Sequence, residues 1–234
     1  MKRQIKNLIF LLLSVVRRDT KPKVVFYHDI GKKYTNMGTD ITIFQDHMRH
    51  LRACDVVCFD DGFKGVWDQR ELLASLKGRV KIFLAIDLIG KEGYLSRDEI
   101  VTLAAEYGID FQCHTWSHQT LAGPYNDEVP EPPEGRTEAW FYHELNDSKR
   151  MLEELLNKKV NALCFPVGYF SDDVIARCRA AGYEEVYASF PGDLTNEYLK
   201  ARCLVQDLTV LGFKAVLRGG MNCLKPRYVR MHRF

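Results

Sequence analysis

Two short stretches carry side chains that together could hold a metal ion. His114 and His118 lie four residues apart in His-Thr-Trp-Ser-His, so both imidazoles can reach one ion from a single turn. Asp60 and Asp61 precede Gly62, a pattern that by itself is typical of a turn. Jointly, one carboxylate and two imidazoles would leave an open position on Zn²⁺ for water, which is a hydrolytic arrangement. The neighbouring carboxylate could then be the base that deprotonates the water.

These residues stand beside short apolar, β-branched runs that indicate strands, and helix-period stretches alternate with the runs. Such alternation favours parallel β-structure with right-handed crossovers, and seven or eight such units fit a barrel better than an open sheet. The expected strands are 23–27, 56–59, 80–86, 109–113, 162–165, 185–188 and 203–205. The expected helices lie near 44–52, 66–76, 97–107, 138–156, 172–181 and 210–218.

Polar residues gather at the carboxyl ends of the expected strands. His28, Asp60, His114 and Pro166 each stand directly after one of them. In a parallel barrel those ends share one face, where active sites collect. The Pro-rich, acidic stretch 122–136 predicts a long loop over one rim of that face.

Several of these stretches resemble the motifs of the polysaccharide deacetylases, carbohydrate esterase family 4. Residues 59–62, Phe-Asp-Asp-Gly, resemble the first motif, and residues 114–118 resemble the second, H-[ST]-x-x-H. Residues 165–168, Phe-Pro-Val-Gly, are similar to the Pro-x-Gly of the third motif, and 25–30 resemble the Tyr-His opening of one branch. The resemblance covers residues 23–218, and its specific part is the first two motifs together.

The resemblance implies a single-domain, distorted (β/α)7 barrel that uses a divalent metal, for which we expect Zn²⁺. The implied reaction removes N-acetyl groups from amino sugars of a polysaccharide or a glycan precursor. By position, Asp60 matches the family's catalytic base, and Asp61 matches its carboxylate metal ligand. His114 and His118 match the two imidazole ligands.

The resemblance also suggests residues on the substrate side. The N–H of Val167, which follows Pro166, matches a donor that helps to hold the tetrahedral oxyanion. Trp116 and Tyr169 either line a sugar subsite, because rings cover the apolar face of a pyranose, or pack beside the loops. Arg202 resembles an arginine that follows the sixth strand in the Tyr-His branch and orients the first motif.

Two positions depart from the family pattern. Cys164 stands where many members carry an arginine two residues before the Pro of the third motif, so the base would lack a cationic partner that lowers its pKa. Residues 203–211 contain no Leu-x-His, so the family's usual general acid is missing. His28 is our candidate for that acid, and a purely structural role is its alternative.

Two further functions stay open at this point. The same metal site would suit a deformylase or another hydrolase of C–N bonds. A catalytically degenerate member would bind a glycan or a partner without turnover, and the missing arginine and histidine favour that alternative.

Charge is balanced overall but uneven along the chain. The sum is +2, from 33 Lys/Arg and 31 Asp/Glu, which argues against a nucleic-acid partner. The first 23 residues carry seven Lys/Arg against one Asp. The apolar run 8–16 is too short to cross about 30 Å of hydrocarbon. We expect either a helix packed on the domain or a segment, 2–18, in peripheral contact with an anionic membrane.

The cysteines indicate the subcellular location that we expect. Seven cysteines, none in a CxxC pair and most inside apolar runs, indicate buried thiols in a reducing compartment. We therefore expect a cytoplasmic protein, peripheral to the membrane in one alternative and exported through a signal peptide in another. The expected organisation is a basic and apolar segment at 1–22, a barrel at 23–220 and a basic, solvated tail at 221–234.

Overall fold

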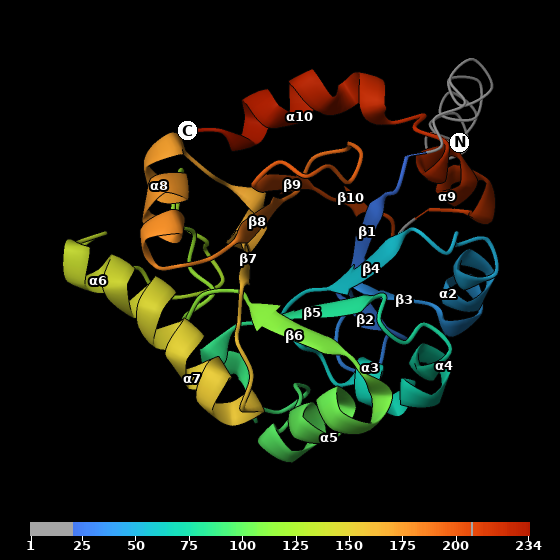
Figure 1. Cartoon of the computed structure of the whole chain (residues 1–234), viewed down its shortest axis with the longest axis horizontal. Coiled ribbons are helices and arrows are strands. Elements are labelled where there is room, and N and C mark those ends of the chain that lie inside the picture. Colours follow the sequence, from blue (N-terminus) through green and yellow to red (C-terminus); the bar gives the residue numbers. More distant parts are fainter. Residues whose placement is uncertain (1–20, 207) are drawn as a thin grey trace.

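The computed structural model describes residues 21–206 and 208–234, which fold around one parallel sheet (Figure 1). Eight strands are hydrogen-bonded in the order β10-β1-β4-β5-β6-β7-β8-β9, and every neighbouring pair is parallel. The strands are β1 Val24–Tyr27, β4 Val56–Phe59, β5 Val80–Leu84, β6 Asp110–Cys113, β7 Ala162–Cys164, β8 Glu185–Ala188, β9 Leu199–Ala201 and β10 Cys203–Leu204.

The sheet curls into a nearly closed barrel, because its two edge strands, β9 and β10, are consecutive in the chain. Only Arg202 separates β9, which pairs with β8, from β10, which pairs with β1. The expected α/β barrel is confirmed, with a correction at the seventh strand. The strand expected at 203–205 is present as β10, and β9 is an additional strand that was not expected, because the segment changes partners at Arg202.

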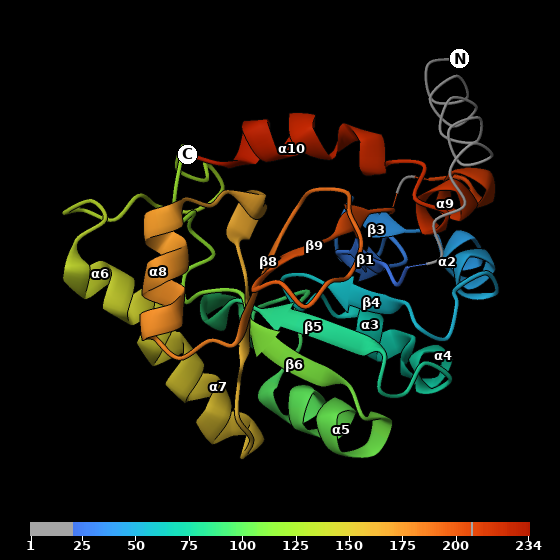
Figure 2. The same cartoon turned by 45° about the horizontal axis from the view of Figure 1, so that its top comes forward.

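Helices surround the barrel (Figures 1 and 2). They are α2 Ile41–Met48, α3 Gly65–Asp68, α4 Arg70–Ala74, α5 Arg97–Tyr107, α6 Glu138–Tyr142, α7 Ser148–Leu156, α8 Asp172–Ala180, α9 Val210–Leu217 and α10 Lys225–His232. Short 3₁₀ turns occupy Ile86–Leu88, Pro166–Gly168 and Asn222–Leu224, a π-helical turn occupies His143–Asp147, and a small ribbon pairs β2 Asp29–Ile30 with β3 Gly38–Thr39.

α5 illustrates how local signals set a helix. Its N-cap Ser96 accepts the N–H of Glu99, while the Glu99 carboxylate accepts the N–H of Ser96, which is a capping box. Gly108 ends the helix at φ 65°, a conformation that glycine adopts readily. The bounds of α5 are those expected. By contrast, the single helix expected at 66–76 is divided at Gln69, whose backbone is not helical.

Alternate residues of each strand point to opposite faces of the sheet and so belong to two different hydrophobic clusters. The barrel interior is filled by Val24, Phe26, Cys58, Phe83, Ala162, Cys164 and Tyr187. The intervening residues of the strands, such as Val25 and Tyr27 of β1, pack outward in the larger cluster that includes the helices. Because the interior is packed, chemistry must take place at the ends of the strands.

The C-terminal stretch, for which we expected a basic and solvated tail, has no buried residue in its helix but is ordered against the domain. Its residues form α10, which lies across the molecule between α9 and α8 (Figure 1). Beyond the helix, the N–H of Phe234 donates to the carbonyl of Phe170 at 2.9 Å. The tail is therefore docked on the loop that follows β7.

The expected N-terminal segment, apart from its last two residues, lies outside the described residues. Among the helices that the structure does describe, none has the length and apolar character needed to span a membrane.

Candidate functional site

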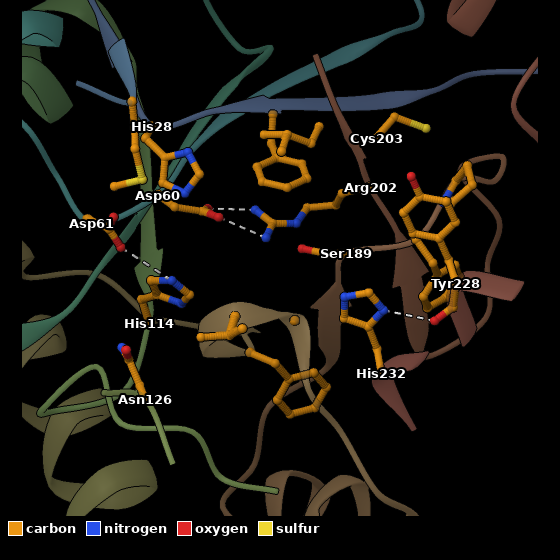
Figure 3. A pocket seen from close by; sticks show the side chains of 18 of the residues that line it. His28, Asp60, Asp61, His114, Asn126, Ser189, Arg202, Cys203, Tyr228 and His232 are labelled. Atoms are coloured by element: carbon orange, nitrogen blue, oxygen red, sulfur yellow. Dashed lines mark hydrogen bonds and ion pairs between the residues drawn. The ribbon is translucent and has the colours of Figure 1, made fainter. Parts of the chain in front are cut away.

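One cavity collects the polar residues that follow the strands. It measures about 570 Å³ and is lined by His28 after β1, Asp60 and Asp61 after β4, and His114 and His118 after β6 (Figure 3). The structure therefore brings together the five side chains that the sequence places at strand ends.

Backbone strain is concentrated around this cavity. Of the five non-glycine residues with positive φ in the described chain, four are Asp61 at 68°, Thr115 at 69°, His118 at 66° and Val167 at 59°. Such conformations cost on the order of 1–3 kcal/mol each and persist only where the surrounding fold holds them. The loops that carry the candidate ligands are thus held in defined positions.

Asp61, His114 and His118 form a group suited to one metal ion. Asp61 Oδ1 lies 3.1 Å from His118 Nε2 and 3.5 Å from His114 Nε2. The Nδ1–H of His114 donates to the carbonyl of Cys164 at 2.8 Å, which leaves the lone pair on Nε2 facing the carboxylate. Burial lowers the pKa of His114 to about 4, so this imidazole is neutral at pH 7, as a ligand must be.

The environment of Asp61 also fits a cation. Burial alone would raise its pKa, but His118 and His114 outweigh burial and hold the pKa well below its usual value. Its Oδ1 is buried and makes no hydrogen bond within the described part of the chain. An ionised carboxylate oxygen and the two imidazole nitrogens that face it form a ligand set that a divalent ion such as Zn²⁺ would satisfy.

Asp60, His114 and Cys164 form a second group of potential ligands, but their chemistry fits a metal less well. Burial raises the pKa of the Cys164 thiol well above its ordinary value, so a metal would have to displace a tightly held proton to bind this sulfur. Both Asp60 oxygens already accept hydrogen bonds from Arg202.

Arg202 is the cationic partner of Asp60. Its Nη1 and Nη2 donate to the two carboxylate oxygens at 2.6 and 2.9 Å, and both side chains are buried. Burial by itself would raise the pKa of Asp60, but the guanidinium, assisted by His114, holds it below the usual value. Phe26 and Phe83 face the guanidinium, which lies 4.2 and 5.2 Å from their ring centres. The pair is therefore enclosed in the barrel interior.

This pair resolves the missing arginine of the third motif. Cys164 occupies that position, and Arg202 Nη2 lies 2.7 Å from its sulfur. The guanidinium that pairs with Asp60 thus comes from the junction between β9 and β10, whereas the family pattern places an arginine at the end of β7. Asp60 is thus ionised at neutral pH although the expected arginine position is a cysteine.

His28 stands on the same side of the cavity as Asp60 (Figure 3). Its Nδ1 is 2.7 Å from Gln206 Oε1, so Nδ1 carries a proton and Nε2 is the atom available to a ligand. The imidazole also contributes to the lowered pKa values of Asp60 and Asp61. This position is compatible with the role of acid expected for His28.

The loop after β7 presents Val167 to the cavity. Pro166 begins the 3₁₀ turn, Val167 is left-handed, and Gly168 follows at φ 81°. A Cβ on Gly168 would lie 2.5 Å from the Cβ of Ser189, so only glycine allows this close approach. The loop thereby keeps Val167 half-exposed at the edge of the cavity.

The two rings proposed for a sugar subsite lie elsewhere. Trp116 packs against His143 with ring centres 4.2 Å apart, and Tyr169 packs against Phe234 at 5.0 Å. Neither belongs to the described residues that line the cavity. Their contacts correspond to the packing alternative.

Glu144 is a functional residue that sequence reasoning missed. Its buried carboxylate accepts the N–H groups of Trp116 and Ser117 at 2.9 and 3.0 Å and the Ser117 hydroxyl at 2.7 Å. It thus holds the loop between His114 and His118. No sequence signal distinguishes this acid from the other charged residues of the expected helix 138–156.

The far side of the cavity was also unforeseen. Tyr228 and His232 of α10 line it, whereas Asn126 of the rim loop lines the cavity beside His118, with Asn126 Nδ2 3.3 Å from His118 Nδ1. The long loop at 122–136 does border the site, but the basic composition of the tail suggested a solvated terminus.

The family model described as polysaccharide deacetylase matches residues 52–186, and the chain belongs to this family. Among curated proteins it is similar to "Putative polysaccharide deacetylase YxkH" of Bacillus subtilis (strain 168), with 22% identity over 182 residues. That match covers 77% of this chain and 60% of the relative, so the chain spans less than two thirds of the relative's length.

Solved structures share the fold. BC0361, a polysaccharide deacetylase from Bacillus cereus, superimposes with a TM-score of 0.70 at 22% identity, covering 84% of this chain and 69% of that one. IcaB from Ammonifex degensii gives a TM-score of 0.69 at 17% identity, covering 87% of this chain and 98% of that one. These structural similarities establish the barrel fold. The substrate and the metal have to be inferred from the residues of the site.

Proposed function

We propose that this protein is a metal-dependent hydrolase that removes N-acetyl groups from amino sugars of a polysaccharide or a glycan precursor. The observation that carries the proposal is the Asp61–His114–His118 group beside a separate, ionised carboxylate, Asp60. Membership of the polysaccharide deacetylase family supports the class of substrate.

In this proposal the two acids have different tasks. Asp61, with His114 and His118, would hold the divalent ion, which we propose is Zn²⁺ and which, when bound, would polarise an acyl carbonyl and acidify water. Asp60 accepts the proton of the attacking water, and Arg202 keeps that carboxylate ionised and oriented.

Two further groups act on the leaving amine and on the carbonyl oxygen of the acetyl group. The leaving amine needs a proton, and His28 supplies it from Nε2 when the ring is in its imidazolium form, with the Nδ1–H kept in its hydrogen bond to Gln206. The N–H of Val167 donates to the oxyanion as negative charge develops.

Acetate release from N-acetylated amino-sugar oligomers tests this proposal. We expect the wild type to release acetate and Asp60→Asn to lower kcat by about 100-fold or more, with zinc affinity retained in calorimetric titration. Asp98→Asn, an exposed acid on α5, is the matched control and should retain the wild-type rate. An Asp60→Asn variant with a wild-type rate would remove Asp60 from the base role.

The two other functions have distinct outcomes in the same assay. A deformylase would release formate from N-formyl sugars faster than acetate from N-acetyl sugars. A degenerate binder would release neither, although the Asp60–Arg202 pair weakens the case for degeneracy that the Cys164 position suggested.

We further propose a cytoplasmic location, with residues 2–18 in peripheral contact with the membrane. The absence of any disulfide among the seven described cysteines is consistent with this location. Cys54 and Cys223 are exposed, so a membrane-impermeant thiol reagent applied to intact cells should leave both unlabelled. Labelling of either would indicate export.

A further inference from the structure

One wall of the cavity comes from α10. Tyr228 and His232 line the cavity on the side away from Asp61 and His114 (Figure 3). α10 lies outside the residues that the family model matches, 52–186. The wall is therefore built by a part of the chain that does not define the family.

The C-terminal end of this wall is fixed to the loop that follows β7. Phe170 donates its N–H to the carbonyl of His232 and accepts the N–H of Phe234, both at 2.9 Å. The Phe234 ring packs edge-on against Tyr169. It also lies over Gly123, where a Cβ would come within 2.6 Å of the ring.

The N-terminal end of the wall lies beside Phe190. Lys225 Nζ lies 5.5 Å from the centre of the Phe190 ring, and Phe190 and Met221 also line the cavity. α10 therefore contacts the rest of the fold near both of its ends, on the side of the cavity that Tyr228 and His232 line.

The face that α10 turns to the cavity has the chemistry to contact a sugar. The Nδ1–H of His232 donates to the carbonyl of Tyr228 at 2.8 Å, which leaves Nε2 free to bond a hydroxyl. The rings of Tyr228 and His232 are parallel, and an aromatic face can cover the apolar face of a pyranose. Ser189 adds a hydroxyl to the same side of the cavity.

We propose that α10 ends the substrate cavity, that Tyr228 and His232 contact the sugar ring that carries the acetamido group, and that the enzyme therefore acts on chain ends or short saccharides. This inference rests on the proposed function. An internal sugar unit needs an exit on both sides, and α10 closes one of them.

The first test locates the deacetylated unit. The wild-type, zinc-loaded enzyme acts on an N-acetylglucosamine hexamer, and mass spectrometry of the first product identifies which unit has lost acetate. We expect a terminal unit, and we expect kcat/KM for a dimer to be at least equal to that for the hexamer. First products deacetylated at internal units would overturn the inference.

The second test removes the contacts of the wall one at a time. His232→Asn keeps a donor for the Tyr228 carbonyl but lacks the nitrogen that faces the cavity, and Tyr228→Ala removes the ring. Each should raise KM for the dimer about five- to tenfold with kcat changed less than twofold. Tyr228→Phe keeps the ring and should stay close to wild type, as should Arg230→Ala on the exposed face of α10.

Two controls separate this inference from the proposed function. Calorimetric zinc affinity should be unchanged in His232→Asn and Tyr228→Ala, which shows that the folded site persists. If the wild type releases no acetate, the proposed function fails, and dimer binding measured by NMR then decides the inference. Equal dimer affinity, or equal KM, in wild type and in both variants would overturn it.

Discussion

Asp60 lies where an isolated carboxylate would tend to be protonated. The barrel interior around it is apolar, and desolvation of a charge there costs several kcal/mol. Arg202 offsets this cost through two hydrogen bonds and lies between two aromatic rings. The ionised state of the proposed base therefore depends mainly on one buried guanidinium.

Loss of this cation should destabilise the fold in a way that depends on Asp60. We expect Arg202→Met to lower the free energy of unfolding by about 3–5 kcal/mol, because it leaves a buried charge unpaired. The double variant Asp60→Asn/Arg202→Met should recover part of that loss. Urea denaturation of the wild type, both single variants and the double variant measures the coupling. Additive effects would contradict the assigned pair.

Asp29 supplies a pH-dependent contribution to stability. Burial raises its pKa to about 7, and its Oδ2 makes no hydrogen bond in the described chain. The unfolded pKa is about 3.9, so the folded state binds more protons between these values. Stability is therefore lost as pH rises from about 4 to 7, by about 4 kcal/mol at most.

Asp29→Asn should remove that loss. Relative to wild type, the variant should gain stability between pH 5 and pH 8, as measured by urea denaturation at both values. His47, whose pKa burial lowers to about 4, titrates in an overlapping range but is present in both proteins. Asp98→Asn should follow the wild-type pH dependence. An Asp29→Asn variant that also follows it would show that Asp29 ionises freely in the folded state.

At the scale of elements, the ligand loop between β6 and the long rim loop depends on a π-helical turn. Glu144 belongs to that turn, and its three hydrogen bonds to Trp116 and Ser117 support a loop with two left-handed residues. π-helical turns occur frequently at functional sites. Here the turn places one buried carboxylate opposite two backbone donors.

Glu144→Gln should therefore weaken metal binding without removing a ligand. An amide offers the two backbone N–H groups a neutral oxygen in place of a charged one and turns an NH2 group toward the Ser117 hydroxyl, so these hydrogen bonds weaken and the loop between His114 and His118 should lose order. We expect zinc affinity to fall about 10- to 100-fold in calorimetric titration. Glu154→Gln, on the exposed face of α7, is the control. Unchanged affinity in Glu144→Gln would show that the loop holds its conformation without this carboxylate.

At the scale of the whole molecule, metal binding should stabilise the fold. Asp61 comes from the loop after β4 and the two histidines from the loop after β6, so one ion would link two loops that are distant in sequence. Any ligand that binds only the folded state shifts unfolding by mass action. The metal is thus expected to be part of the stability of the barrel.

Zinc at 100 times its Kd should raise the free energy of unfolding by about 2.7 kcal/mol. Thermal denaturation with zinc and then with excess chelator measures the gain and its reversal. The gain should disappear in Asp61→Ala and in His114→Ala but persist in His50→Ala, an exposed histidine. A gain that persists in Asp61→Ala would place the ion elsewhere.

Sequence reasoning succeeded where the signal is local. The strand runs are short and buried, and the capping box and Gly108 mark α5 directly. Because strands of a parallel barrel end on one face, the sequence alone allowed four residues to be assigned to one site, namely Asp60, Asp61, His114 and His118. Local composition did not reveal the contacts of α10, whose exposed Lys and Arg residues are typical of a solvated tail.

The sequence by itself determined the alternation of strands and helices, the α/β barrel and the motif residues at the strand ends, because these depend on periodicity and on order along the chain. Only the tertiary structure decided that Arg202, which the resemblance linked to the first motif, pairs with Asp60 itself, 142 positions away, that Glu144 supports the ligand loop, and that α10 lines the cavity. Those contacts depend on where the barrel closes and on which helix face packs inward. Both are set by long-range packing, for which single residues carry no local signal.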